Sequence, residues 1–547
     1  MITPAASFFP LPNPRPAQIE ALNFISAAYA KGYRDIVIAA PTGVGKTAIG
    51  AAASYWAAQP GAASPHESGG YYLVTQKLLQ DQIERDFPKF KWPAGSIMSA
   101  IEYPCAGAYS NCMIGQRRRP RCQHVKNGTC RQKMAIETFK SAQLAVTNYP
   151  YFLTSCLYTN LKPRRLIVCD ECHTVERQLM GFVELVISRD TLYRFAPALL
   201  PAPTFTDRDD FLAWLQKTYV PVLMNKRKSL DDAVSNNTLT IEVEQAMNRG
   251  ENPQTSLGRA LNELDAHLTK IAIVIDQLTE DPDNWVFWQE QHGDDLNTIC
   301  KPLYVDQFAH EYFDQAEMRI YMSAYPGPKR VFSRCLGLEP KNVAWLDLPS
   351  TFPVNNRLVH LLLVGSMSRN NEKAVLPSIL RMCEHILNKH GNEKGLIHCH
   401  KYSLGQAIFD HLQGTKHASR ILFASKARER QTMLRHHHES MLPTVLLSPS
   451  MAEGFSLDDD LARFQIIAKM PYPYLGDHQI AARKDQDPDW YAMQTVMTVL
   501  QACGRIVRSE TDFGSTYILD SDFQRLLERH GDFFPEWFLE SFVEYKK

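Results

Sequence analysis

Short apolar segments recur along the chain and are separated by longer segments with helical periodicity. The short segments are rich in Val, Ile and Leu and are apolar on both faces, which is typical of strands buried in a parallel sheet. They form a first series at 36–40, 71–75, 143–147, 165–170 and 319–323, and a second at 395–399, 420–424, 444–448, 464–470 and 516–520. Strands that alternate with helices in this way predict an α/β fold with two doubly wound parallel sheets.

Two stretches interrupt the first series. Residues 101–135 contain four cysteines, and residues 180–315 have the polar, periodic pattern of a mainly helical region. Prolines and polar residues near 346–357 break the pattern between the two series. We therefore expect a first α/β domain at 1–350, with these two stretches as insertions, and a second α/β domain at 351–547.

Composition and charge narrow the class of protein. The chain has 547 residues, of which 45% are hydrophobic and 22% are charged, as in an ordinary globular protein. Its 59 Lys and Arg residues balance 59 Asp and Glu residues, so binding to nucleic acid would require a local basic patch. The sequence contains neither a secretory signal pattern nor an apolar run of membrane-spanning length. We expect an intracellular protein that does not use a membrane as a partner.

The first apolar segment leads into a phosphate-binding pattern. Ala40, four further residues and then Gly45-Lys46-Thr47 make a Walker A loop in which Ala replaces the first Gly. Glycines in the loop let backbone N–H groups approach phosphate oxygens. In this pattern the lysine reaches the β- and γ-phosphates and the threonine hydroxyl binds Mg²⁺. The residues expected to surround ATP are Pro41, Thr42, Gly43, Val44, Gly45, Lys46 and Thr47.

A pair of carboxylates supplies the second half of this site. Asp170 ends an apolar strand and Glu171 follows it directly. The first carboxylate can hold Mg²⁺, and the second can orient or deprotonate a water molecule. Cys169 and Cys172 flank the pair as a CxxC, but the carboxylates between them explain the segment better than a thiolate metal site does.

The order of the motifs along the chain resembles that of the superfamily 2 helicases. The segments that carry the resemblance are APTGVGKT (40–47), TQKLLQDQ (75–82), DECH (170–173), MSAYP (322–326), EGFS (453–456) and QACGRIVR (501–508). Four cysteines between the second and third segments are similar to those of the XPD/DinG group of iron–sulfur helicases. The resemblance implies two RecA-like domains, with a cysteine-rich insertion and a helical arch insertion in the first.

The resemblance also implies an activity and the residues that perform it. The chain would be an ATP-dependent DNA helicase or translocase that moves 5′ to 3′ along single-stranded DNA and unwinds duplex or forked DNA. Gln18 would contact the adenine, and His173 would couple the site to the last motif. In that motif Gln501, Arg505 and Arg508 match the family pattern, with both arginines directed at the γ-phosphate. Their spacing predicts neighbours on one helix face.

Four cysteines with wide spacing make up the candidate metal module. Cys105, Cys112, Cys122 and Cys130 are separated by 6, 9 and 7 residues, unlike the close pairs of a structural zinc site. Spacing alone leaves iron–sulfur, zinc and no metal open. The position of the module among the helicase motifs implies a 4Fe–4S cluster.

The same module is strongly basic. Between Tyr103 and Ala135 there are seven basic residues and no acidic ones; the basic residues are Arg117, Arg118, Arg119, Arg121, Lys126, Arg131 and Lys133. Such a patch attracts phosphate backbones, and Tyr103 and Tyr109 could stack on bases. The alternative is a solvated loop whose positive charges offset cluster thiolates.

Two motifs depart from the family pattern. Tyr325 stands where Ser-Ala-Thr is usual, and Ser456 replaces the usual Asp of the segment after Glu453. These motifs couple hydrolysis to movement, so ATP hydrolysis is predicted more firmly than unwinding. Two alternatives therefore stay open: an RNA helicase of the DEAH type, and a DNA-dependent ATPase that assists another complex without unwinding.

Overall fold

A computed structural model describes most of the chain. The described residues are 3–59, 66–107, 112, 122–158, 161–236, 253–293, 295–424, 429–448, 457 and 459–543. Contacts divide the chain into two compact units; the first comprises 1–37, 46–322 and 333–344, and the second comprises 38–45, 323–332 and 345–547. The domain limits expected from the sequence at 350 and 351 stay a prediction.

The first large sheet has seven strands in the order β10-β1-β9-β5-β2-β4-β3. Their bounds are β1 Asp35–Ala39, β2 Glu67–Val74, β3 Ala94–Ser96, β4 Leu144–Asn148, β5 Arg164–Asp170, β9 Met318–Ser323 and β10 Val343–Asp347. The pairs from β3 to β9 are parallel, and β5 pairs with β9 through Leu166↔Met318 to Asp170↔Met322. All residues of β1 and β4 are buried, as the apolar runs predict for strands covered on both faces.

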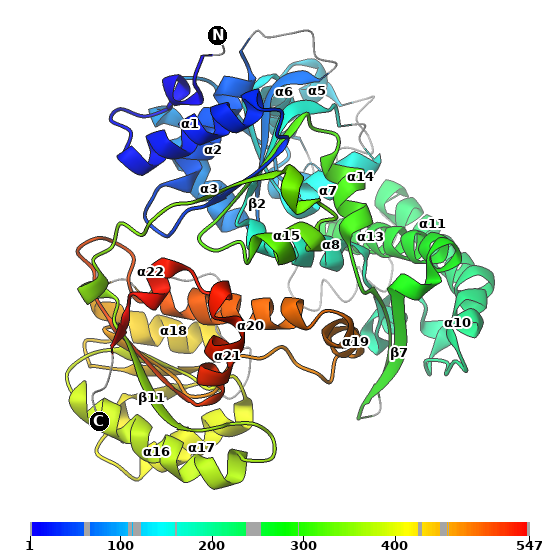
Figure 1. The fold of residues 1–547 in the computed structure, drawn as a ribbon. Helices are drawn as coiled ribbons and strands as arrows, with labels where there is room; N and C mark the ends of the chain where they lie inside the picture. The colour runs from blue at the N-terminus through cyan, green and yellow to red at the C-terminus, as the bar shows by residue number, and fades with distance from the viewer. Residues whose placement is uncertain are drawn as a thin grey trace. The chain divides into compact units, whose positions relative to one another are not determined.

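Helices cover both faces of this sheet. The helices that flank it include α1 Pro16–Ala30, α2 Lys46–Ala57, α3 Lys77–Asp86, α6 Arg131–Ser141 and α7 Tyr149–Tyr158. Figure 1 shows α1 and α2 on one side of β2 and α7 on the other. Ten consecutive residues of α2, from Ala48 to Ala57, are buried, because small alanines let this helix pack closely on the sheet.

The stretch at 180–315 combines helices with a small sheet. Its helices include α10 Arg208–Trp214, α11 Val220–Asn236, α13 Pro253–Glu280 and α14 Asp306–Phe313, and α11 packs against α13. Its antiparallel sheet has the order β6-β8-β7, with bounds β6 Leu185–Ile187, β7 Trp285–His292 and β8 Asp295–Pro302. The insertion is therefore less purely helical than its periodicity predicts, since β7 and β8 form a hairpin.

The second large sheet is parallel throughout and has the order β13-β14-β12-β15-β16-β11-β17. Its strands are β11 Val359–Gly365, β12 Gly395–His398, β13 Ile421–Phe423, β14 Val445–Ser448, β15 Phe464–Ile467, β16 Ser515–Asp520 and β17 Phe542–Val543. The helices are α16 Glu372–Lys389, α17 Tyr402–Gln413, α18 Arg430–Glu439, α19 His478–Gln486, α20 Pro488–Cys503 and α21 Asp522–His530. Figure 1 shows α16 and α17 on one face and α18 and α20 on the other. The predicted α/β class with two parallel sheets is confirmed.

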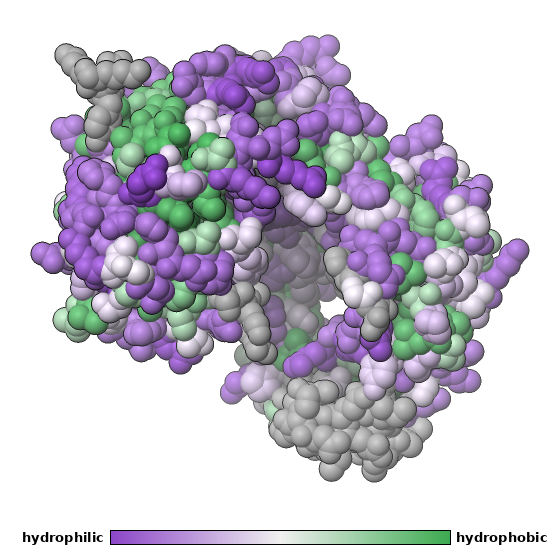
Figure 2. Space-filling model, turned by 90° about the horizontal axis from the view of Figure 1, so that it is seen from below, coloured by the Kyte–Doolittle hydropathy of each residue, from purple (hydrophilic) through white to green (hydrophobic). Residues whose placement is uncertain are grey.

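In the part of the chain that the structure describes, no helix has the length and apolar character needed to cross a bilayer. Figure 2 shows one face of the molecule, on which polar and apolar residues are interspersed.

Candidate functional site

The predicted Walker A loop connects strand β1 to helix α2. Gly43 and Gly45 have φ values of 91° and 89°, a region that side-chain-bearing residues rarely adopt. A Cβ atom at Gly43 would also lie 2.6 Å from the ring of Phe352. Helix α2 starts at Lys46 and has 12 residues, so its first N–H groups are available to an anion at the end of the loop.

Lys46 lies beside the predicted catalytic carboxylate. Its Nζ is 3.5 Å from Oε1 of Glu171, although the two residues are far apart in the sequence. Burial alone would lower the pKa of the Lys46 amino group, but the Glu171 and Asp170 carboxylates outweigh this effect and raise it. Lys46 therefore stays protonated and can neutralise phosphate oxygens that reach it.

Asp170 ends strand β5 in a buried position. Its side-chain Oδ1 accepts a hydrogen bond from the N–H of Glu171 at 3.0 Å, and its carbonyl oxygen accepts one from the Tyr149 hydroxyl at 3.0 Å. Burial and the charge of Glu171 raise the pKa of Asp170 to about 6, against the opposing effect of Lys46. The donor set suits Mg²⁺, because the Asp170 carboxylate and the Thr47 hydroxyl offer the oxygen ligands that this cation prefers.

Glu171 occupies an unusual backbone conformation. Its φ and ψ are 49° and 50°, and its carbonyl oxygen accepts hydrogen bonds from the N–H and the hydroxyl of Thr174 at 2.9 and 2.8 Å. This turn places the Glu171 carboxylate between two basic groups, since Oε2 lies 3.3 Å from Nδ1 of His173. A left-handed non-glycine residue costs about 1 kcal/mol, and such strain concentrates at functional sites.

The two cysteines that flank the carboxylates are part of the core. Cys169 and Cys172 are almost completely buried. Burial raises the pKa of the Cys169 thiol to about 12 and raises the pKa of the Cys172 thiol well above its usual range. Both groups therefore stay protonated, which agrees with the choice of Asp170 and Glu171 as the chemical groups of this segment.

Gln18 caps the first helix of the chain. Its Oε1 accepts a hydrogen bond from the N–H of Arg15 at 2.8 Å, and the side chain is buried. Pro16 occupies the first position of α1, where its missing N–H costs nothing. The adenine contact expected from the resemblance stays a prediction for Gln18.

The last motif lies at the end of helix α20. Gln501 is in the last turn of the helix, which ends at Cys503 and is followed by Gly504. Arg505 is buried and Arg508 is half-buried, and both belong to the turn after the helix. The prediction that the two arginines share a helix face is therefore wrong. The helix stops at Gly504, and the N–H of Arg508 binds the carboxylate of Asp512 at 3.0 Å rather than a helical carbonyl.

Two of the four module cysteines lie side by side. The Sγ atoms of Cys112 and Cys130 are 3.7 Å apart, both residues are buried, and the Cys112 thiol donates to Oε1 of Gln132 at 3.2 Å. Cys105 and Cys122 are half-buried, and all four are free thiols. Among the described residues, no three His, Cys, Asp or Glu side chains are arranged to hold a metal ion. The module thus supplies soft sulfur donors and brings two of them together.

Most of the predicted basic patch falls outside the described residues. Tyr109 and the four arginines belong to this part; the arginines are Arg117, Arg118, Arg119 and Arg121. Among the described members, Lys133 forms an exposed ion pair with Glu137 at 2.6 Å. The Tyr103 hydroxyl accepts a hydrogen bond from the N–H of Met98 at 3.1 Å, which ties this ring to its own loop.

Of the two motifs that differ from the family pattern, the structure describes one. The segment 453–456 lies outside the described residues. Tyr325 is described, and its hydroxyl donates a hydrogen bond to the carbonyl oxygen of Phe533. Neither the periodicity nor the motif pattern predicts this contact, since it depends on the extra length of the tyrosine side chain.

Comparison with known families assigns two domain types. Residues 383–541 match the model described as "Helicase C-terminal domain", and residues 11–194 match the model described as "Type III restriction enzyme, res subunit". The first match spans strands β12 to β16 of the second sheet, and the second match contains the Walker A and DECH segments.

Curated relatives are helicases of limited similarity. The chain is 26% identical over 136 residues to the regulator of telomere elongation helicase 1 homolog of Caenorhabditis elegans, covering 22% of this chain and 13% of that protein. It is 25% identical over 304 residues to the ATP-dependent DNA helicase YoaA of Haemophilus influenzae, covering 52% of this chain and 45% of that protein. The chain thus spans less than half the length of these relatives.

Solved structures share the fold over nearly the whole chain. A structure titled "XPD_Helicase" has a TM-score of 0.60 at 14% identity, covering 98% of this chain and all of that chain (100%). The structure of Xpd4 from S. tokodaii has a TM-score of 0.58 at 14% identity, with coverage of 97% and 100%. At this identity the likeness concerns the fold.

Proposed function

We propose that the chain is an XPD/DinG-like superfamily 2 helicase that acts as an ATP-dependent DNA helicase or translocase; its two helicase-type domain matches and its XPD-like fold support this. The observation that carries the proposal is the contact between Lys46 and Glu171 at 3.5 Å. It brings a phosphate-binding cation and a water-orienting carboxylate to one place at the ends of β1 and β5.

The Walker A loop and the residues at the end of strand β5 have separate roles in hydrolysis. The loop N–H groups at 43–47 bind the phosphates, and Lys46 exchanges its contact with Glu171 for the β- and γ-phosphate oxygens of ATP. That exchange releases Glu171 to orient the attacking water, with His173 holding its second oxygen. Thr47 and Asp170 would hold Mg²⁺, which neutralises phosphate charge in the transition state.

The second unit supplies the remaining positive charge. Gln501, Arg505 and Arg508 follow the order of the last helicase motif, and we expect both arginines to stabilise the γ-phosphate in the transition state. Cycles of ATP binding and release then drive the two parallel-sheet domains along single-stranded DNA, 5′ to 3′ by resemblance, so that forked or duplex DNA is opened.

A 4Fe–4S cluster is proposed for the cysteine module. Cys105, Cys112, Cys122 and Cys130 would hold it as thiolates, the ligand type of such clusters. The 3.7 Å approach of Cys112 to Cys130 supports a shared site for two of the four. When bound, the cluster would rigidify the module and set the shape of the DNA path beside it.

The primary test is ATP hydrolysis with and without single-stranded DNA. We expect DNA-stimulated hydrolysis by the wild type and a loss of at least about 100-fold in K46A, because the developing phosphate charge loses its main cation. The matched control is K162A, since Lys162 is an exposed lysine of the same unit. Hydrolysis by K46A at the wild-type rate would contradict the proposed site.

A second candidate function has one specific observation in its favour. Tyr325 replaces the usual Thr of the coupling motif and binds the carbonyl oxygen of Phe533. A DNA-stimulated ATPase that does not unwind would fit this replacement. Strand displacement on substrates with 5′ or 3′ tails distinguishes a DNA helicase from an ATPase that does not unwind. Stimulation of ATP hydrolysis by single-stranded DNA, compared with stimulation by RNA in the same preparation, distinguishes both from an RNA helicase.

A further inference from the structure

The turn that carries Arg508 is anchored by apolar residues on one side. Ile506 and Val507 lie between the two arginines and are 1% and 4% exposed. They pack in one cluster with Leu457, the residue that follows the EGFS segment. A Cβ atom at Gly514 would lie 2.7 Å from the Ile506 side chain, so the backbone at the end of the turn packs closely against Ile506.

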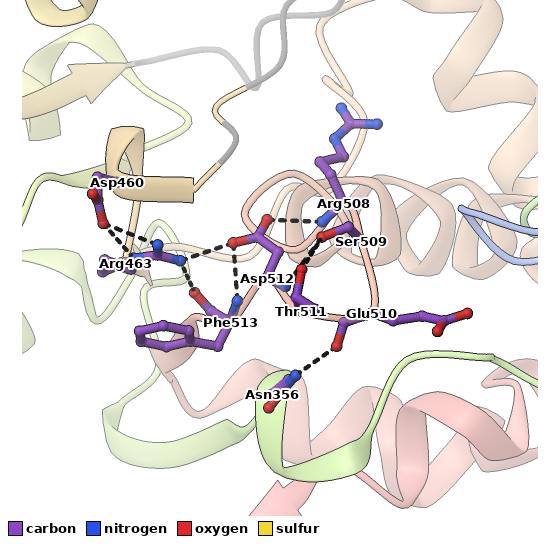
Figure 3. Close-up of polar contacts among 9 residues, drawn as sticks. All are labelled: Asn356, Asp460, Arg463, Arg508, Ser509, Glu510, Thr511, Asp512 and Phe513. Atoms are coloured by element: carbon purple, nitrogen blue, oxygen red, sulfur yellow. Dashed lines mark hydrogen bonds and ion pairs between the residues drawn. The ribbon is translucent and has the colours of Figure 1, made fainter.

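A buried carboxylate closes the other side of the turn. Asp512 is 1% exposed, and its Oδ2 accepts a hydrogen bond from the N–H of Arg508 at 3.0 Å. Its Oδ1 accepts from the N–H of Phe513 at 2.9 Å and from Nη1 of Arg463 at 2.8 Å. The N–H of Asp512 donates to Oγ of Ser509 at 3.1 Å. Figure 3 shows these contacts around the Asp512 side chain.

Arg463 connects this carboxylate to a different part of the second unit. Its Nε and Nη2 atoms donate to Oδ1 of Asp460 at 3.1 and 2.9 Å, and Asp460 follows the EGFS segment by four residues. Its guanidinium lies 4.0 Å from the ring centre of Phe513 and also donates to that residue's carbonyl oxygen at 2.9 Å. The geometry of the arginine turn therefore depends on the segment after EGFS.

A further contact holds the tip of the turn. Nδ2 of Asn356 donates to the carbonyl oxygen of Glu510 at 3.0 Å, and the carbonyl oxygen of Asn356 accepts from the N–H of Gly514 at 2.9 Å. The backbone from 508 to 514 is thus bound at both ends and at its tip.

The Arg508 side chain takes no part in these contacts. In Figure 3 it points away from Asp512, whose Oδ2 accepts the hydrogen bond from the backbone N–H of Arg508. A carboxylate that paired with the guanidinium would compete with phosphate for it. Asp512 instead fixes the backbone point from which the Arg508 side chain extends.

We propose that Asp512 is a positioning residue for Arg508, and that Arg463 makes this positioning depend on the segment that follows EGFS. The inference rests on the proposed function, since it assumes that Arg508 acts on the γ-phosphate. A misplaced arginine loses transition-state stabilisation while the nucleotide still binds through the Walker A loop, so the effect should fall on kcat rather than on KM.

The first experiment compares D512N with E510Q in DNA-stimulated ATP hydrolysis. Both changes remove one negative charge from the same turn, but the Glu510 side chain is exposed. We expect kcat of D512N to fall about 10- to 100-fold with KM for ATP within about 2-fold of wild type, and E510Q to stay near wild type. Equal kcat values for D512N and E510Q would overturn the positioning role.

A double-mutant comparison separates positioning from a general structural effect. If Asp512 acts through Arg508, adding D512N to R508A should change kcat by no more than about 2-fold, because the positioned group is already gone. A further loss equal to that of D512N alone would show that Asp512 acts independently and would overturn the inference. Thermal melting of both variants, together with binding of a fluorescent ATP analogue, checks that the fold and the Walker A site are intact.

The variant R463Q tests the same inference if D512N does not fold. R463Q keeps the contact between Asp512 and the N–H of Arg508 but removes the connection to Asp460, and it should show a smaller kcat loss that R508A also masks. Additive losses of R463Q and R508A would overturn the role of Arg463. If the wild-type protein does not hydrolyse ATP, both the proposed function and this inference are overturned. If the wild type hydrolyses ATP and kcat of D512N is unchanged, only the inference is overturned.

Discussion

The Nζ atom of Lys46 lies 3.5 Å from Oε1 of Glu171, so the lysine that is expected to bind phosphate is held by the carboxylate that is expected to orient water. His173 holds the other oxygen of that carboxylate at 3.3 Å. Phosphate binding by Lys46 and water activation by Glu171 therefore both depend on the contact between these two side chains.

E171Q should bind ATP but hydrolyse it slowly. Glutamine keeps the size of the side chain and loses the basic oxygen, so Lys46 is no longer drawn away from the phosphates while the water loses its base. We expect kcat to fall about 100- to 10,000-fold and the affinity for ATP to be retained or increased. Single-turnover hydrolysis with equilibrium binding of ATP measures both. Rapid turnover by E171Q would remove Glu171 from the role of the water-orienting group.

The activity should fall in mild acid because of Asp170. The pKa of its carboxyl group is raised to about 6 by burial and by Glu171, and only the ionised form can hold Mg²⁺. We therefore expect kcat/KM for ATP, which reports the free protein, to fall as the pH drops through about 6. A profile that stays flat between pH 7.5 and pH 5 would contradict this assignment.

The same pKa shift predicts that the stability of the fold changes with pH in the direction opposite to the activity. A carboxyl group whose folded pKa is raised binds its proton more tightly in the folded state, so its stabilising contribution is present at low pH and is lost as the pH rises through about 6. D170N removes the buried charge and should raise the melting temperature at pH 7.5 without nucleotide. The gain should shrink towards pH 5, where wild-type Asp170 is protonated. D81N is the matched control, since Asp81 is exposed on α3.

One ion pair should dominate the stability of the first sheet. Arg319 of β9 binds Asp35 of β1 through two contacts, Nε to Oδ1 at 2.6 Å and Nη2 to Oδ2 at 2.8 Å, with side-chain exposures of 13% and 11%. R319A leaves a buried carboxylate without this partner and should cost about 3–5 kcal/mol in urea unfolding. R189A breaks the exposed pair with Asp295 and should cost about 0–1 kcal/mol. Similar costs for the two variants would contradict the assignment of Arg319 as a buried structural partner.

Removal of one module cysteine should lower the iron content of the protein. C112S replaces a thiol that lies 3.7 Å from Cys130, and an alcohol is a poor iron ligand at neutral pH. C156S changes a half-buried cysteine of α7 and is the matched control. Iron and sulfide analysis after anaerobic purification should show the loss in C112S alone. A wild type without iron would contradict the proposed cluster, while its ATP hydrolysis would still test the nucleotide site.

The strands were largely predictable because their signal is local. Each of the ten apolar segments of the two series coincides with a strand, and their alternation with helices gave the correct fold class. The strands that the pattern missed include β3 and β17, which have three and two residues and are too short for periodicity. The hairpin of β7 and β8 was also missed, because half-exposed antiparallel strands inside a helical stretch lack a continuous apolar run.

Which chemical groups the protein carries, and in what order, is already evident from its amino-acid sequence. Glycines that require positive φ, a lysine at a helix start and carboxylates at a strand end are recognisable because each depends on neighbours in the chain. Tertiary structure decided which of these groups meet. Lys46 reaches Glu171 because β1 and β5 lie in one parallel sheet with β9 between them, and the fold brings Cys112 to Cys130. Asp512 carries no motif signal at all, since its role arises from a buried contact with Arg463 that only the folded chain creates.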